Sequence, residues 1–111
     1  LPGGTGTRHL VNAAVLDALG PRGTLVNVAR GSIVDEAALV AALQSGALGA
    51  AALDVFEDEP RVPAALLAME NVVLQPHVGS ATDETRTAMG QLVIDNLTAH
   101  FAGLPLPTRV A

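Results

Sequence analysis

The 111-residue sequence contains no cysteine, tryptophan, tyrosine or lysine, and its only aromatic residues are Phe56 and Phe101. Without cysteine the chain can form neither a disulfide framework nor a thiolate metal site, and we expect no bound metal. Half of the residues are apolar. The core must therefore be built from alanine, valine, leucine and isoleucine, which suits the close packing of helices on a sheet.

Positive charge is also scarce. The six basic residues are all arginine, there are eleven carboxylates, and the formal net charge is −5. Because a nucleic-acid-binding surface needs a basic patch, we expect no nucleic-acid partner. No run of about 18 apolar residues occurs, so we expect no membrane span. Nothing near Leu1 resembles a signal peptide, which favours a cytoplasmic location by default.

Capping residues and apolar patterns predict that strands alternate with helices. Asn12 and Asp35 are candidate N-caps of two helices, and a long third helix is expected from about Thr82. Its apolar residues form one predicted stripe, consisting of Met89, Leu92, Val93, Leu97 and Phe101. Short apolar runs predict three buried strands, at residues 24–28, 50–55 and 72–75.

This alternation is typical of a parallel sheet with right-handed crossovers. We therefore expect an α/β fold that is part of a doubly wound (Rossmann-like) parallel sheet, with a long C-terminal helix. Parallel sheets are normally covered on both faces, and three strands alone make a poor core. We expect the unit to be incomplete.

Polar residues follow each of the three expected strands. Arg30 and Gly31 follow the first strand, the acidic run at residues 54–59 surrounds the end of the second, and His77 follows the third. The carboxyl ends of parallel strands meet at one edge, so these groups are expected to converge there. Simpler explanations exist for each residue alone, because such an arginine often forms a surface salt bridge and such a histidine is often a surface or capping residue.

Three segments resemble motifs of the D-isomer-specific 2-hydroxyacid dehydrogenases, in the expected order and spacing. Residues 27–36 resemble the Asn-x-x-Arg-Gly-x-x-Val-Asp-Glu segment, residues 53–60 the Asp-Val-Phe-Glu-x-Glu-Pro signature, and residues 75–82 the Pro-His-x-Gly/Ala segment. The resemblance implies NAD or NADP as cofactor, a small 2-oxo or 2-hydroxy acid as substrate, and a homodimer for the complete enzyme. Residues 78–86 are most like glyoxylate/hydroxypyruvate reductases and 2-ketogluconate reductases.

The phosphate-binding loop of a dinucleotide site is not recognisable in the sequence. Residues 3–6 have neither the Gly-x-Gly-x-x-Gly spacing nor a preceding strand. On the resemblance we assign residues 1–102 to the later portion of the dinucleotide-binding domain, without its phosphate-loop half or the substrate domain. Residues 103–111 are assigned to a C-terminal tail. We expect this chain alone to be inactive.

The resemblance also implies three catalytic residues. Arg30 would bind the carboxylate and carbonyl oxygens of a 2-oxo acid, because a guanidinium meets a carboxylate with two parallel hydrogen bonds. His77 would be the general acid that protonates the carbonyl oxygen during reduction. Glu59 would hold the other imidazole nitrogen.

The remaining charged residues near these positions have less specific expectations. Glu57 and Asp58 are expected in a solvated loop. His9 and His100 are expected to be ordinary surface or capping histidines, because neither lies at the carboxyl end of a strand.

Cofactor-binding residues implied by the resemblance are expected on the same edge. Asp54 would face the nicotinamide carboxamide, with Val28, Ala29 and Gly79 at the same end of the cofactor. Pro2 and Thr7 match family positions near the cofactor, although they could equally just shape a loop. The full expected set is Pro2, Thr7, Val28, Ala29, Arg30, Asp54, His77 and Gly79.

Two other classes of function are also open. The family includes transcriptional corepressors, so the same fold could sense NAD(P) without catalysis. Alternatively, an exposed sheet edge and apolar helix stripes could make the chain an oligomerising α/β module. Arg30, Glu59 and His77 together give no sign of a disabled site, and they favour the enzyme.

Overall fold

The computed structural model describes residues 1–110, which divide into two compact units. The first unit is Leu1–Gly79 and the second begins at Ser80. The division predicted from the sequence, with a separate tail at residues 103–111, stays a prediction, and residue 111 of that tail lies outside the described residues.

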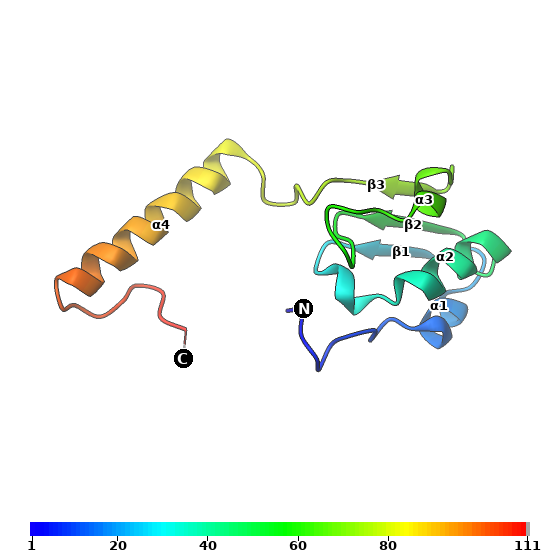
Figure 1. Ribbon diagram of the computed structural model, residues 1–111, viewed down its shortest axis with the longest axis horizontal. Helices are drawn as coiled ribbons and strands as arrows, with labels where there is room; N and C mark the ends of the chain where they lie inside the picture. The colour runs from blue at the N-terminus through cyan, green and yellow to red at the C-terminus, as the bar shows by residue number, and fades with distance from the viewer. Residues whose placement is uncertain (111) are drawn as a thin grey trace. The chain divides into compact units, whose positions relative to one another are not determined.

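The first unit is built on a three-stranded parallel sheet (Figure 1). Its strands lie in the order β1 (Thr24–Asn27), β2 (Ala50–Leu53) and β3 (Val72–Leu74). Each ends one or two residues earlier than the sequence predicts, although single backbone hydrogen bonds continue the pairing beyond β2 and β3. The predicted α/β class with a parallel sheet is confirmed.

Two predicted helices of this unit begin at their predicted caps. The Asn12 side chain accepts a hydrogen bond from the Val15 N–H (3.3 Å) at the start of α1 (Ala13–Leu19). The Asp35 side chain accepts one from the Ala38 N–H (3.0 Å) at the start of α2 (Glu36–Ser45). Each carboxylate or amide oxygen thereby satisfies an N–H that has no partner inside its helix.

Two short elements are absent from the prediction. The 3-10 helix η1 (Gly31–Ile33) has three residues, and the helix α3 (Ala64–Leu67) has four. Neither has a side-chain cap hydrogen bond. Elements this short are below the length at which apolar periodicity can be recognised.

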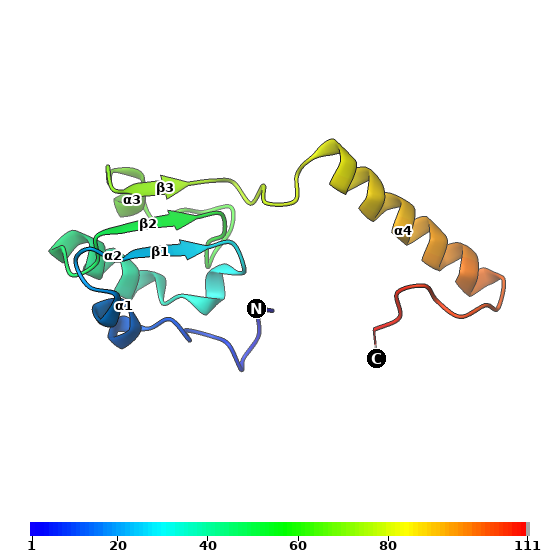
Figure 2. The same ribbon diagram turned by 180° about the vertical axis from the view of Figure 1, so that it is seen from behind.

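The helices of the first unit lie on one face of the sheet, as Figures 1 and 2 show from opposite sides. The other face carries exposed valines: Val26, Val28 and Val73 are 63%, 70% and 60% exposed. Within residues 1–79 the sheet therefore has cover on one face, not on two. The main buried cluster lies on the covered face and consists of Leu16, Val34, Leu39, Ala42, Leu43, Leu48, Ala51, Leu53, Phe56 and Leu66.

The second unit consists of the predicted long helix, α4 (Asp83–Phe101), and the residues that follow it. Thr82 caps α4 by accepting a hydrogen bond from the Thr85 N–H (3.2 Å). The chain then returns along the helix, where the Asn96 side chain donates to the Thr108 hydroxyl (2.8 Å). None of the helices described for residues 1–110 has both the length and the hydropathy that a bilayer crossing requires.

Candidate active site

His77 and Glu59 form the centre of the site. His77 Nδ1 lies 2.8 Å from Glu59 Oε2, and Glu59 Oε1 accepts a hydrogen bond from the Phe56 N–H (3.1 Å). The hydrogen bond with His77 is the main cause that holds the pKa of the Glu59 carboxyl below its usual range, aided by the Phe56 N–H and the charge of Arg30. An ionised Glu59 can only accept, so Nδ1 carries a proton and Nε2 is the nitrogen available to a ligand.

Asp54 fixes the backbone turn that follows His77. Its two carboxylate oxygens accept hydrogen bonds from the Val78 and Gly79 N–H groups, both at 2.8 Å. The Val78 N–H is the main cause of a lowered pKa at Asp54. His77 itself has a left-handed backbone (φ 55°), which histidine adopts more readily than most residues. Asp54 therefore positions the imidazole as well as lining the site.

Arg30 lies in the loop after β1, and the buried Asn27 holds this loop. The Asn27 amide donates to the Arg30 carbonyl (3.0 Å) and its oxygen accepts from the Ala29 N–H (3.1 Å). Asn27 is thus a structural residue of the site that the sequence reasoning did not assign. The signal that could have identified it is an amide at the end of an otherwise apolar strand.

Gly31 brings the Arg30 loop into backbone contact with the Glu59 loop. A Cβ on Gly31 would lie 1.9 Å from the Phe56 carbonyl carbon and 2.4 Å from the Glu57 nitrogen. No side chain fits such a space, so glycine is required for the approach. The arginine and the glutamate implied as catalytic residues therefore belong to two loops in direct contact.

The N-terminal loop lies beside Arg30. The Thr7 hydroxyl donates to the Pro2 carbonyl (2.8 Å), and this bond closes the loop on itself. A Cβ on Gly3 would lie 3.3 Å from Arg30 Cγ. Thr7 thus shapes the loop, as one of the two explanations from the sequence expects, while a role of Pro2 and Thr7 in cofactor binding stays a prediction.

A cavity of about 260 Å³ lies at the carboxyl ends of the strands. Val28, Asp54 and Gly79, three of the expected cofactor-binding residues, line it together with Val26, Ala52, Leu53, Val73 and Gln75. Valine side chains suit the face of a flat ring, and a carboxylate oxygen that accepts one N–H still has capacity for a donor such as a carboxamide. The residues present therefore fit the nicotinamide end of a dinucleotide.

The expectation of a solvated loop is wrong for Glu57. Its side chain is 25% exposed, accepts a hydrogen bond from the Arg8 guanidinium, and lies 3.0 Å from His9 Nε2. These partners precede Glu57 by 49 and 48 residues, so no local pattern announces the contact. Asp58 agrees with the expectation, because its side chain is 66% exposed and pairs with Arg61 at the surface (2.8 Å).

The other histidines lie outside the His77–Glu59 pair. His9 contacts Glu57, which the sequence reasoning missed, whereas His100 has an edge-to-face contact with its neighbour Phe101. Among residues 1–110 no cluster of three or more histidine or carboxylate side chains is placed to hold a metal ion. A metal-free site stays a prediction.

Comparison with protein families identifies the chain. The family described as "D-isomer specific 2-hydroxyacid dehydrogenase, NAD binding domain" matches residues 1–79, well over half of the sequence. The chain belongs to this family. The resemblance stated from its three motifs is thereby confirmed.

Similar dehydrogenases include enzymes of plants and bacteria. The chain is 60% identical over 104 residues to the hydroxyphenylpyruvate reductase of Plectranthus scutellarioides, covering 94% of this chain and 33% of that protein. It is 51% identical over 108 residues to the 2-ketogluconate reductase of Gluconobacter oxydans, covering 97% of this chain and 35% of that protein.

A solved structure is similar over the whole chain. The NADPH-dependent glyoxylate/hydroxypyruvate reductase of Sinorhizobium meliloti, in complex with NADP and malonate, is 58% identical, with a TM-score of 0.97. The match covers 100% of this chain and 35% of that one. The chain therefore spans about a third of the length of the relatives it matches.

Proposed function

We propose that this chain is part of an NAD(P)-dependent reductase that converts a short 2-oxo acid, such as glyoxylate or hydroxypyruvate, into the D-2-hydroxy acid. The observation that carries the proposal is the 2.8 Å contact between His77 Nδ1 and Glu59 Oε2 at the sheet edge that also bears Arg30. An imidazole oriented by a carboxylate is suited to proton transfer, and a nearby guanidinium is suited to an anionic substrate.

In this proposal His77 moves the proton. Its Nε2 donates to the carbonyl oxygen of the 2-oxo acid, while Nδ1 stays hydrogen-bonded to Glu59. The carboxylate orients the ring and stabilises the positive charge that the imidazole carries before donation. A bound nicotinamide supplies the hydride that adds to C2.

Arg30 binds the substrate carboxylate in this proposal. Its guanidinium is planar and permanently charged, so it can fix a carboxylate with two hydrogen bonds. Asn27 and the close approach at Gly31 hold the loop that carries it. Arg30 would increase the rate by positioning, because the substrate carbonyl is then presented to His77 in one orientation.

The cofactor-binding residues in this proposal are those expected from the sequence. Val28, Ala29, Asp54 and Gly79 would hold the nicotinamide end together with Arg30 and His77, and Pro2 and Thr7 would lie near it. Residues 1–102 form the later portion of the dinucleotide-binding domain. The complete enzyme is proposed to be a cytoplasmic homodimer without nucleic-acid or membrane partners, which light scattering of the purified enzyme and cell fractionation can test.

A hybrid enzyme tests the proposed function, because the chain spans a third of its relatives. The chain would replace the matching residues of the Sinorhizobium reductase, and turnover of glyoxylate with NADPH would be measured. We expect His77→Asn to lower kcat about 100- to 10,000-fold, the usual contribution of general acid catalysis, with little change in NADPH affinity. Asparagine also tolerates the left-handed backbone of residue 77.

The matched control is His100→Asn, which removes an imidazole from α4 and should leave turnover unchanged. Arg30→Lys keeps the charge but loses the bidentate geometry, and we expect it to raise KM for the 2-oxo acid about tenfold. Full turnover in His77→Asn would refute the role of the imidazole. Nucleotide binding without turnover in the unmutated hybrid would instead identify a sensor of NAD(P).

A further inference from the structure

We propose that Glu57 is a positioning residue, whose contacts with Arg8 and His9 hold the Glu59 loop in place beside the Arg30 loop. This inference rests on the proposed function only for its catalytic meaning. The contacts that carry it lie entirely within the first unit. They join the N-terminal loop, the start of α2 and the loop after β2.

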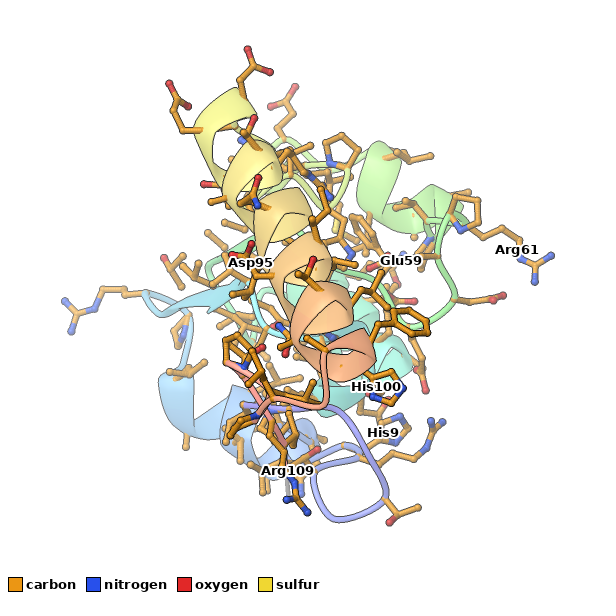
Figure 3. The ribbon with its side chains drawn as sticks, turned by 90° about the vertical axis from the view of Figure 1, so that its left-hand side faces the viewer. His9, Glu59, Arg61, Asp95, His100 and Arg109 are labelled. Atoms are coloured by element: carbon orange, nitrogen blue, oxygen red, sulfur yellow. The ribbon has the colours of Figure 1, made fainter. Side chains whose placement is uncertain are left out.

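The side chain of Glu57 is held from the N-terminal loop. Oε1 accepts from the Arg8 guanidinium and lies 3.0 Å from His9 Nε2. His9 is itself fixed, because its N–H donates to the Ser32 carbonyl (2.9 Å) and its Nδ1 lies 3.9 Å from an Asp35 oxygen. Figure 3 labels His9, which belongs to the N-terminal loop, and Glu59, which belongs to the loop after β2. Glu57 therefore ties the Glu59 loop to an anchored residue.

Backbone hydrogen bonds on either side of the Phe56–Glu57 peptide connect Glu57 to the His77–Glu59 pair. The Glu57 N–H donates to Glu36 Oε1 (3.3 Å), at the first residue of α2. The preceding N–H, that of Phe56, donates to Glu59 Oε1 (3.1 Å). Gly31 packs against the peptide that joins Phe56 to Glu57. A shift of this peptide would therefore move the carboxylate that orients His77 and the loop that carries Arg30.

The negative charges around Glu57 explain why its side chain needs the basic partners Arg8 and His9. Glu36 and Glu57 lie close together, and Asp35 and Asp58 add negative charge from the cap of α2 and the same loop. The pKa of Glu36 is raised, first by burial and then by the charges of Glu57 and Asp58. Arg8 and His9 are the basic side chains that contact Glu57, whereas Asp58 pairs with Arg61. Without them Glu57 would be repelled from the start of α2.

Asp58 provides the matched control in the same loop. It is the next residue, it carries the same charge, and its ion pair with Arg61 spans only three positions of the chain. Figure 3 shows Arg61 pointing away from the body of the unit, into solvent. Asp58 therefore has a surface ion pair that does not reach the Phe56–Glu57 peptide.

Nuclear magnetic resonance of the 111-residue chain tests the positioning directly. The chain has only three histidines, so the ring signals of His77 can be followed without crowding. In Glu57→Ala we expect the exchange rate of the Phe56 amide to rise at least about tenfold and the His77 ring signals to shift. In Asp58→Ala both should match the parent chain, and the His100 signals serve as an internal reference.

Unchanged Phe56 exchange and unchanged His77 signals in a folded Glu57→Ala chain would overturn the proposal. Should that variant fail to fold, Glu57→Gln and Arg8→Gln decide the question, because each keeps a hydrogen-bonding side chain and removes only one charge. The expected result is the same displacement of the His77 signals in both variants. Signals equal to those of the parent chain in both would again overturn the proposal.

The hybrid reductase then tests the catalytic meaning. We expect Glu57→Ala to lower kcat about tenfold, because the proton donor is no longer held in position. KM for NADPH should change less than about twofold, because the residues that line the cavity at the strand ends are unaltered. Asp58→Ala should match the parent hybrid. An inactive parent hybrid would defeat the proposed function and leave the resonance experiment to decide the role of Glu57. Full activity in Glu57→Ala would overturn that role.

Discussion

The two units of the chain contrast in what stabilises their helices. In the first unit Leu39 on α2 is buried against a core that includes Leu16 and Leu48. In the second unit Ala99 is the one buried residue of α4 within the described chain. Both helices begin at a side-chain cap, at the residue where the sequence predicts their start. Caps and periodicity therefore establish where a helix forms, but not what its apolar side packs against.

The energetic difference follows from burial. A fully buried leucine stabilises a fold by roughly 1.5–3 kcal/mol relative to an exposed one, and the core leucines of the first unit contribute on this scale. The predicted stripe of α4 is instead about half exposed or more. The helix is held by its own backbone bonds, its Thr82 cap and the Asn96–Thr108 contacts.

The strongest test of this contrast is a pair of leucine truncations. Leu48 is 0% exposed in the first unit, whereas Leu97 on α4 is 52% exposed. We expect Leu48→Ala to lower the free energy of unfolding by roughly 2–5 kcal/mol, and Leu97→Ala to change it by about 0.5 kcal/mol or less. Urea denaturation followed by amide hydrogen exchange measures both. Equal losses in the two variants would abolish the contrast.

Acidification tests the hydrogen-bonded carboxylates of the first unit. The pKa values of Asp54 and Glu59 are lowered by their hydrogen bonds, chiefly with the Val78 N–H and with His77. A lowered folded-state pKa contributes stability above the unfolded value, near about pH 4, and this stability is lost as pH falls through the lowered value. We expect the Val78 and Gly79 amides to lose exchange protection in that range.

The sign of this effect makes the measurement decisive. Thermal unfolding and amide exchange would be followed from about pH 6 to about pH 3, and Asp54→Asn should show the loss already at neutral pH, because an asparagine oxygen can replace only one acceptor. Protection of Val78 and Gly79 that is constant across the whole range would contradict the described role of Asp54.

The smallest expected effect is a gain in α4. Gly90 lies inside the helix, and a Cβ there would meet nothing within 4 Å. We expect Gly90→Ala to stabilise α4 by about 0.5–1 kcal/mol, because alanine restricts the unfolded chain and favours the helix. Circular dichroism during heating measures the gain. A loss of stability would show that α4 packs closely against a surface at this position. The contrast between a packed helix in the first unit and an exposed one in the second would then be smaller.

Much of the fold was predictable from local signals. Asn12, Asp35 and Thr82 each combine a polar cap with an apolar pattern behind it, and all three helices begin there. The strands were found from apolar runs, but their ends were set by side chains such as Asn27, which turns the chain with its own hydrogen bonds. The helix α3 could not be found, because its four residues give no repeat to recognise.

The site was predictable where residues follow strands. Glu59 and His77 were brought together by the topology of a parallel sheet, in which the ends of neighbouring strands meet. Glu57 was missed for the opposite reason, because Arg8 and His9 reach it from a loop that no strand aligns with it. Contacts made between irregular segments depend on the complete tertiary structure, and no pattern along the chain encodes them.

The fixed position of the Asp54 carboxylate has a thermodynamic consequence for any molecule that binds in the cavity at the carboxyl ends of the strands. Each of its oxygens already accepts a hydrogen bond from one backbone N–H, and the residue is buried. A donor that meets this carboxylate finds an acceptor that is preorganised, so its affinity is not reduced by the entropy of fixing a mobile side chain. By reciprocity, such a donor would also make the backbone after His77 harder to open.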